Sequence, residues 1–159
     1  MREIKFRAWI EDVTTGGDQI KEMISYDELM HYGEPLNPMI GNAECYHIEG
    51  KIEWMQYTGL KDKNGKEIYE GDILLVPDEW TEPVLDDGSG PREPCNHLAP
   101  VTFNDGSFGI LITDKADIYS KGFWPFPIIE KDIGDTNNQM EVIGNIYENL
   151  ELLKETSNG

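Results

Sequence analysis

The stretch from residue 52 to residue 77 constrains the fold of this chain more than any other part of the sequence. Two β-prone runs, residues 52–58 and 73–76, flank a polar segment that contains the dipeptide Asn64-Gly65. Asn-Gly is a strong hairpin signal, because both residues tolerate the positive φ values of the tightest turns. We therefore interpret residues 53–77 as a hairpin that fixes the register of a β-sheet.

Short strand patterns separated by turn residues continue along the chain. Residues alternate over positions 2–10, with Ile4 and Ala8 on the expected buried face and Trp9 on the other. A strand at residues 19–25 is expected to complete an opening hairpin, and strands at 101–103 and 107–113 are expected to form a second hairpin. A last strand is expected at residues 141–147. Helical periodicity is confined to two short stretches, residues 26–31 and 149–153. The pattern predicts an all-β (β-dominated) fold, a small twisted sheet or an SH3-like partly open barrel with one or two short helices.

The length of 159 residues predicts a single β domain over residues 1–159. Residues 77–100 are rich in proline, glycine and acidic side chains. Such a segment buries too little apolar surface to offset the entropy lost on ordering it. We therefore expect an acidic, mobile insertion between two strands at about 77–100, and a frayed tail at 155–159.

Acidic residues outnumber basic ones by 31 to 13, which gives a formal net charge of −18. Direct binding to nucleic acid is not expected, because affinity for the phosphate backbone comes mostly from lysine and arginine. The charge can serve solubility alone. Alternatively, carboxylates spaced like phosphates can occupy the groove of a nucleic-acid-binding protein. The sequence leaves both interpretations open.

The sequence shows neither a membrane span nor a secretory signal. No apolar run approaches the ~20 residues that a membrane helix needs, and the first residues mix charged with apolar side chains. The two cysteines, Cys45 and Cys95, are too few for a disulfide framework. We expect a cytoplasmic protein with free thiols and no membrane partner.

Two Cys-x-His pairs, Cys45 with His47 and Cys95 with His97, provide potential zinc ligands. Zinc takes such a set tetrahedrally. Structural zinc sites usually leave two or more residues between paired ligands, however, so chance placement is the favoured interpretation. We predict no metal or other cofactor, and we keep these residues as zinc candidates.

Motifs that would announce catalysis are absent from the sequence, which contains no phosphate loop, nucleophile elbow or His-Glu-x-x-His. Asp72 is a candidate catalytic carboxylate, but an aspartate that bonds backbone N–H groups before a strand is far commoner. His31 has no recognisable serine or cysteine partner nearby in the sequence. We therefore predict no catalytic residue and no enzyme.

One apolar segment, residues 122–129, contains Phe123, Trp124 and Phe126 between prolines. The prolines favour a sheet edge or an irregular crossing. Large aromatic side chains most often belong to a core or to a lid over the end of a barrel. The alternative is an exposed patch for a partner chain, and on that interpretation these three residues are the partner-binding candidates.

Several blocks of the sequence resemble the YopX family, small proteins encoded by bacteriophages and prophages. The most specific block is MQYTGLKDKNGKEIYEGDI at residues 55–73, and residues 2–9, 105–109 and 141–149 match in family order. Residues 26–48 and 77–100 stay unmatched, and Leu150 stands where relatives often have proline. The resemblance implies a β-rich, barrel-like domain in a phage or prophage setting, and hence in a bacterial host cell. It implies no reaction and supplies no catalytic residue.

These observations favour a phage or prophage accessory protein that binds another protein without catalysis. The first alternative is an acidic, nucleic-acid-mimicking inhibitor of a host nucleic-acid-binding or defence protein, because the net charge is −18. The least favoured alternative is a small metal-dependent enzyme. We also consider a homo-oligomer, since small barrels with open edge strands often pair them.

Overall fold

The structure is a computed structural model that describes residues 3–13, 19–27, 51–83, 92–113, 121–128 and 139–155. The fold is all-β with few helices, which confirms the predicted class. The contacts divide the chain into two compact units, residues 1–57 and 58–159, and the predicted single domain stays a prediction.

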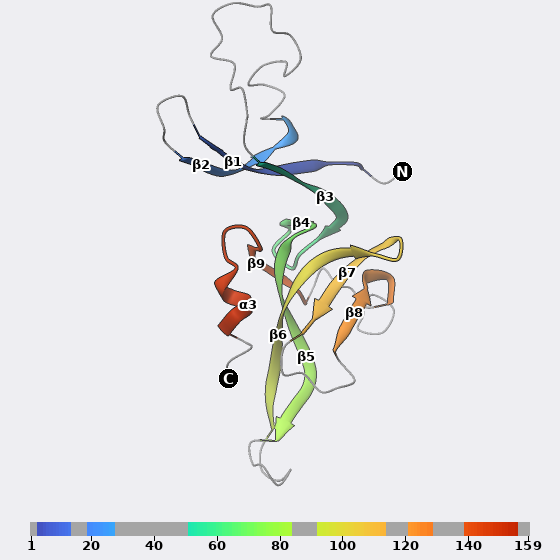
Figure 1. Cartoon of the computed structure of the whole chain (residues 1–159). Helices are drawn as coiled ribbons and strands as arrows, with labels where there is room; N and C mark the ends of the chain where they lie inside the picture. The colour runs from blue at the N-terminus through green and yellow to red at the C-terminus, as the bar shows by residue number, and fades with distance from the viewer. Residues whose placement is uncertain are drawn as a thin grey trace, which may run out of the picture. The chain divides into compact units, whose positions relative to one another are not determined.

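The first unit is built on β1 (Phe6–Val13), β2 (Gln19–Ser25) and the first part of β3 (Lys51–Lys61). β1 pairs antiparallel with β2 on one side and with β3 on the other. Figure 1 shows these strands in blue and green. The predicted opening hairpin is therefore confirmed.

The predicted one-faced alternation of the first strand is wrong. Ile4 precedes β1 and is 71% exposed, whereas Ala8, Trp9 and Ile10 are all buried. Trp9 is buried because the antiparallel pairing places Met23 beside it, and its indole N–H donates to Glu11 Oε1 at 3.0 Å. The centre of β1 is thus buried on both of its faces.

The sequence analysis interpreted residues 53–77 as one hairpin, but the two strand runs of this stretch belong to different sheets. β3 crosses into the second unit, where it turns at residues 62–66 and is hydrogen-bonded to the short β4 (Glu67–Tyr69). The chain then turns again at Gly71, whose φ is 80° and whose N–H donates to the Val101 carbonyl. The second β-prone run consequently starts β5 (Asp72–Pro83) in another sheet, where it pairs with β6 and β9.

The second unit contains a five-stranded sheet of order β8-β7-β6-β5-β9. Its pairings are antiparallel, and β5 and β6 coil around each other as a long hairpin in Figure 1. The remaining bounds are β6 (Arg92–Asn104), β7 (Ser107–Ile112), β8 (Gly122–Pro125), β9 (Glu141–Asn145) and the closing helix α3 (Glu151–Glu155).

Most of the expected insertion at 77–100 is strand. β5 continues through Pro83 and β6 begins at Arg92, so that Pro77 pairs with Asn96 and Thr81 with Pro94. A register shift between Asp78 and Thr81 interrupts the ladder, and Pro77, Pro83 and Pro94 stand in register pairs on either side of it. Composition misled the prediction here because it ignores the pairing that a long hairpin supplies. Residues 84–91 and the predicted frayed tail beyond 155 lie outside the described residues.

The predicted second hairpin is confirmed by the pairing of β6 with β7. Asp105 and Gly106 both have positive φ values, 48° and 81°, as the central residues of a type I′ turn require. The predicted last strand ends earlier than expected, at Asn145, and the helix begins at Glu151. The predicted helical turn at residues 26–31 is described only for residues 26–27, which are helical.

Within the described residues, the core of the second unit is one cluster of buried apolar side chains. Buried apolar side chains come from both central and edge strands, and Leu60 and Trp124 pack against them. The cluster comprises Ile68, Leu74, Val76, Ala99, Val101, Phe108, Ile110, Ile112, Phe126, Met140 and Val142. Burial of such side chains stabilises a fold by roughly 1.5–3 kcal/mol each.

Candidate functional site

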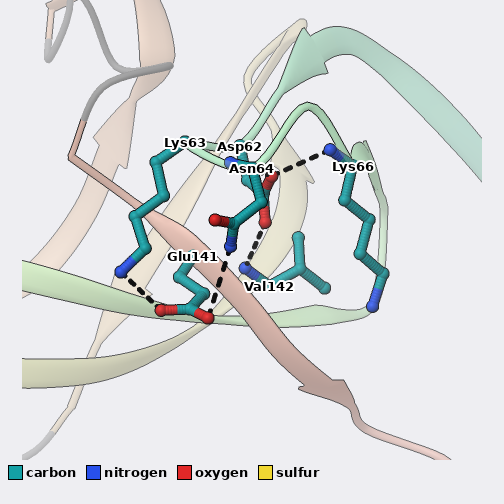
Figure 2. A network of polar contacts seen from close by, with 6 residues as sticks. All are labelled: Asp62, Lys63, Asn64, Lys66, Glu141 and Val142. Atoms are coloured by element: carbon teal, nitrogen blue, oxygen red, sulfur yellow. Dashed lines mark hydrogen bonds and ion pairs between the residues drawn. The ribbon is translucent and has the colours of Figure 1, made fainter.

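A buried carboxylate, Asp62, organises the turn between β3 and β4 (Figure 2). Its Oδ1 accepts hydrogen bonds from the backbone N–H groups of Asn64 and Lys66, both at 2.8 Å. The Gly65 N–H donates to the Asp62 carbonyl at 2.9 Å, and Gly65 has a φ of 81°. Asp62 therefore satisfies the turn's own donors, as turn aspartates commonly do.

The same turn holds β9. Asp62 Oδ2 accepts the Val142 N–H at 3.0 Å, and the Lys63 N–H donates to the Met140 carbonyl at 2.9 Å. On the surface, Lys63 Nζ lies 2.5 Å from Glu141 Oε2, and the Asn64 side-chain amide donates to Glu141 Oε1 at 3.3 Å. Figure 2 shows the contacts of Asp62, Lys63 and Asn64 with Glu141 and Val142 at one end of β9.

The electrostatics of Asp62 suit a structural role. Burial by itself raises the pKa of this carboxyl, but the N–H groups of Val142, Lys66 and Asn64 favour the charged form and leave the pKa below its ordinary value. A carboxylate that stays ionised and is occupied by three backbone donors is a poor proton acceptor. We therefore assign Asp62 to the architecture of the turn.

Asp72 has the structural surroundings that the sequence favoured over a catalytic role. It is 1% exposed, and its Oδ2 accepts the Tyr69 N–H at 2.7 Å across the turn before β5. Asn145, opposite Asp72 on β9, likewise binds locally: its Oδ1 accepts the N–H groups of Tyr147 and Glu148, both at 3.0 Å. Both side chains thus satisfy backbone donors at strand ends.

Only one of the zinc candidates has a described side chain. His97 is 2% exposed on β6, opposite Val76. Cys45, His47 and the side chain of Cys95 lie outside what the structure describes. Within the described residues, no group of three or more His, Cys, Asp or Glu side chains is arranged to hold a metal ion. The zinc hypothesis stays a prediction, and His31 also lies outside the described residues.

The aromatic segment proposed for partner binding contributes to the packing of the second unit. Phe126 is 3% exposed in the core, and Trp124 packs against the same cluster. The ring of Phe123 lies across Gly109, where an added Cβ would come within 2.8 Å of its ring carbons and against the Trp124 carbonyl. Phe123 and Trp124 keep partly exposed surfaces, and whether they contact a partner stays a prediction.

A second aromatic site lies on the sheet of the first unit. Trp54 of β3 is 47% exposed and Tyr26, directly after β2, is 46% exposed. Their ring centroids lie 6.4 Å apart at an interplanar angle of 54°. Trp54 stands directly opposite Ala8 of β1, whose small side chain leaves room for the two rings to meet. The antiparallel register places further apolar side chains on the same side of the sheet.

We call this side of the sheet the Trp54 face. Its apolar members are Phe6, Ala8, Ile10, Ile24, Tyr26, Ile52 and Trp54. Glu22 lies on the same face, because it is the partner of Ile10, and Asp27 follows Tyr26 in the chain. Both carboxylates are exposed, and neither has an ion-pair partner within the part of the chain that the structure describes.

The basic residues described in the first unit lie on the opposite face. Register places Arg7 beside Met55, and it places Lys21 and Lys51 beside Glu11. Lys21 pairs with Glu11 at 3.7 Å and Lys51 with Glu53 at 2.6 Å. Lys5 lies 5.6 Å from the ring centroid of Tyr57, which alternation also puts on that face. The two faces of the described sheet therefore differ in charge as well as in apolar content.

Sequence reasoning missed the Trp54 face. A signal was present in the alternation of Ile52 and Trp54 along β3. That signal became informative only once Ala8 was known to be the neighbour of Trp54. The sequence analysis chose the apolar run around Trp124 because its aromatic residues lie close together in sequence. Closeness in sequence says nothing about the exposure of the side chains.

The chain is thus a small all-β protein with two sheets and structural carboxylates at its turns. Its most distinctive surface feature is the pair of exposed rings on the Trp54 face. The model of the family described as YopX protein matches residues 5–154. The chain therefore belongs to the YopX family, as its sequence blocks indicated.

The chain was also compared with solved structures and with curated protein sequences. A crystal structure of protein EF1440 from Enterococcus faecalis is similar at 22% sequence identity and a TM-score of 0.42, covering 96% of this chain and 99% of that chain. No curated protein sequence gives a significant match. No helix among the described residues is long and apolar enough to cross a membrane.

Proposed function

We propose that this protein is a phage or prophage accessory protein that acts by binding another protein, without catalysis, through the Trp54 face. The observation that carries the proposal is the pair of half-exposed aromatic rings, Tyr26 and Trp54, on an apolar sheet face. Tryptophan and tyrosine are the residues most enriched where binding energy concentrates in protein interfaces.

Exposure of this kind distinguishes the Trp54 face from Phe126 of the aromatic segment at residues 122–129. Trp54 is 47% exposed and Tyr26 46%, whereas Phe126 is 3% exposed. Ala8 and Ile10 of the same face are buried, so the exposed apolar surface of the face is chiefly that of the Trp54 and Tyr26 rings. Exposed apolar patches are a frequent mark of an interaction site. A partner that covered the two rings would bury apolar area, and each Å² of it contributes roughly 25 cal/mol of favourable free energy.

A second copy of this chain is a poor occupant for the face. Each copy carries a net charge of −18, and Glu22, which the register places on the face, would meet like charge across a symmetric contact. Like charges directly opposed across an interface oppose association. The proposal therefore commits to a different protein as the partner.

The experiment is capture of partners from a bacterial host that expresses the tagged full-length protein, followed by identification with mass spectrometry. Trp54→Ala and Tyr26→Ala are compared with Phe103→Ala, which removes a 52% exposed ring from the second unit. We expect a partner that binds the wild type and the Phe103 variant and is lost with either variant of the face. Circular dichroism verifies that all variants are folded.

Two results would contradict the proposal. If recovery of every partner is indifferent to Trp54→Ala, the face does not carry binding. If added duplex DNA displaces the partner and Trp54→Ala does not, the acidic nucleic-acid-mimic alternative replaces the present one, because polyanion mimicry predicts competition by DNA.

A further inference from the structure

We propose that the segment bound by the Trp54 face is cationic, with an arginine or lysine side chain placed against the rings of Tyr26 and Trp54. This inference rests on the proposed function and adds the chemistry of the partner. It derives from three properties of the first unit: the exposed ring faces, the exposed carboxylate of Glu22 on the same face, and the placement of basic residues on the opposite side of the sheet.

The ring pair is suited to a cation. Aromatic faces carry negative potential, and a lysine or arginine within about 6 Å of a ring centroid is attracted to it, most strongly by tryptophan. The rings of Tyr26 and Trp54 are tilted by 54° rather than stacked face to face, and each keeps close to half of its surface exposed. A planar guanidinium can lie against such a face while its N–H groups stay available to carboxylates.

One exposed carboxylate lies on the same face as the rings, and a second follows Tyr26 in the chain. Glu22 lies on the Trp54 face through its pairing with Ile10, and Asp27 is bonded in sequence to Tyr26. Both are exposed. The carboxylates of the opposite face differ from them, because Glu11 and Glu53 are paired with Lys21 and Lys51.

The placement of basic residues favours a cationic partner over a neutral apolar one. Arg7, Lys21 and Lys51 are all on the opposite face by register. None of the described basic side chains of the first unit therefore screens Glu22 or Asp27. A neutral segment would desolvate these two carboxylates without compensation, whereas a cationic one replaces their water with charge-assisted contacts.

The test uses two synthetic peptides that differ only in charge. In one, arginine alternates with threonine; in the other, citrulline replaces each arginine and keeps its shape without its charge. Each is titrated into the full-length protein, and the indole N–H signal of Trp54 is followed by NMR. That signal is assigned by its loss in Trp54→Ala, with the buried Trp9 as an internal reference.

We expect the arginine peptide to shift the Trp54 signal and to bind at least roughly threefold more tightly than the citrulline peptide. Trp54→Ala lacks that signal, so its affinity is measured by titration calorimetry alongside the wild type. The substitution should weaken binding of the arginine peptide by roughly threefold or more, because it removes the stronger of the two ring faces. Glu22→Gln should weaken it by roughly twofold. The matched control is Glu53→Gln, which removes the same charge one residue from Trp54 but on the opposite face, and should leave binding unchanged.

The outcomes separate this inference from the proposed function. Equal binding of both peptides at the Trp54 signal overturns the cationic partner, while a binding face remains. The absence of any shift with the arginine peptide, or equal losses for Glu22→Gln and Glu53→Gln, also overturns it. The proposed function itself fails only when partner capture is indifferent to Trp54→Ala.

Discussion

The carboxylate of Asp62 joins backbone groups that are separated by 80 positions in the chain, because it binds both its own turn and Val142 of β9. Its negative charge matters, since hydrogen bonds to charged groups contribute about 1.5–3 kcal/mol each, more than neutral ones. Residues of this kind look catalytic in a sequence because they are polar and occur in a family motif. In the folded chain their lone pairs are occupied.

Asp62→Asn should lower the free energy of unfolding by about 2–4 kcal/mol, measured by urea denaturation near neutral pH. The substitution removes the negative charge. It also replaces one carboxylate oxygen with an NH₂ group, which cannot accept a hydrogen bond from a backbone N–H. Asp105→Asn is the matched control, because Asp105 is exposed in a turn where asparagine accepts the same positive φ. Equal costs for the two variants would contradict the structural role of Asp62.

The cost of Asp62→Asn should depend on pH in a defined direction. Folding lowers the pKa of Asp62, so its stabilising contribution is present above the unfolded-state pKa and is lost as the pH falls through the folded-state value. The difference between wild type and variant should therefore be constant near neutrality and shrink below about pH 4. A difference that grows on acidification would refute this assignment.

Gly144 on β9 is expected to resist substitution for a steric reason. A Cβ at this position would lie 2.6 Å from Asn149 Oδ1, the atom that accepts the Asn145 N–H. Gly144→Ala should therefore destabilise the protein by about 1–3 kcal/mol. In an Asn149→Ala background the added cost should be smaller, which a double-mutant cycle measures. Strict additivity of the two substitutions would show that the side chain of Asn149 is not the obstacle.

At the scale of elements, local turn chemistry was predictable and long-range pairing was not. Asn104-Asp105-Gly106 joins two strands that pair directly across it, so the β6–β7 hairpin follows from its own sequence. The runs at 52–58 and 73–76 also flank a turn signal, yet β3 and β5 belong to different sheets. Nothing within the stretch reveals that Gly71 directs its N–H to Val101.

The candidate site was less predictable than the fold, for a related reason. Exposure of Trp54 depends on its neighbour across the sheet, Ala8, which is 46 positions away in sequence (54 − 8 = 46). The burial of Phe126 likewise depends on a core assembled from several strands. Residue type identified aromatic side chains in both places, but only the pairing distinguished the covered side chain from the exposed one.

Hydrogen exchange should rank the strands of the second unit by their position in the sheet. β6 has hydrogen-bonded neighbours on both sides and contains the buried residues His97, Ala99 and Val101, whereas β8 ends the strand order. Amides of β6 should therefore be protected at least about tenfold more than those of β8, since edge strands open at lower free energy. Equal protection would mean that β8 opens only together with the whole sheet.

At the scale of the whole molecule, the net charge of −18 should set how stability responds to salt. Repulsion among like charges destabilises a compact state, and salt screens it. Raising NaCl from about 0.01 M to about 1 M shortens the Debye length from about 30 Å to about 3 Å. The thermal midpoint should rise by about 2–4 °C, which corresponds to roughly 1 kcal/mol for a chain of this size.

The control for this prediction is the same titration near the isoelectric point of about 4.3, where the net charge is close to zero and the rise should largely disappear. Scanning calorimetry or fluorescence measures both series. A thermal midpoint that falls with added salt near neutral pH would show instead that ion pairs such as Lys63 with Glu141 outweigh the general repulsion.

The three donors to Asp62 also impose an order in time. Two of them, Asn64 and Lys66, leave the ribosome within four residues of Asp62, whereas Val142 follows 80 residues later. Closing a short loop costs less entropy than closing a long one, so the turn forms first with one carboxylate oxygen still facing water. The turn that binds β9 can thus form while that strand is still unsynthesised, and the arrival of β9 completes the five-stranded sheet.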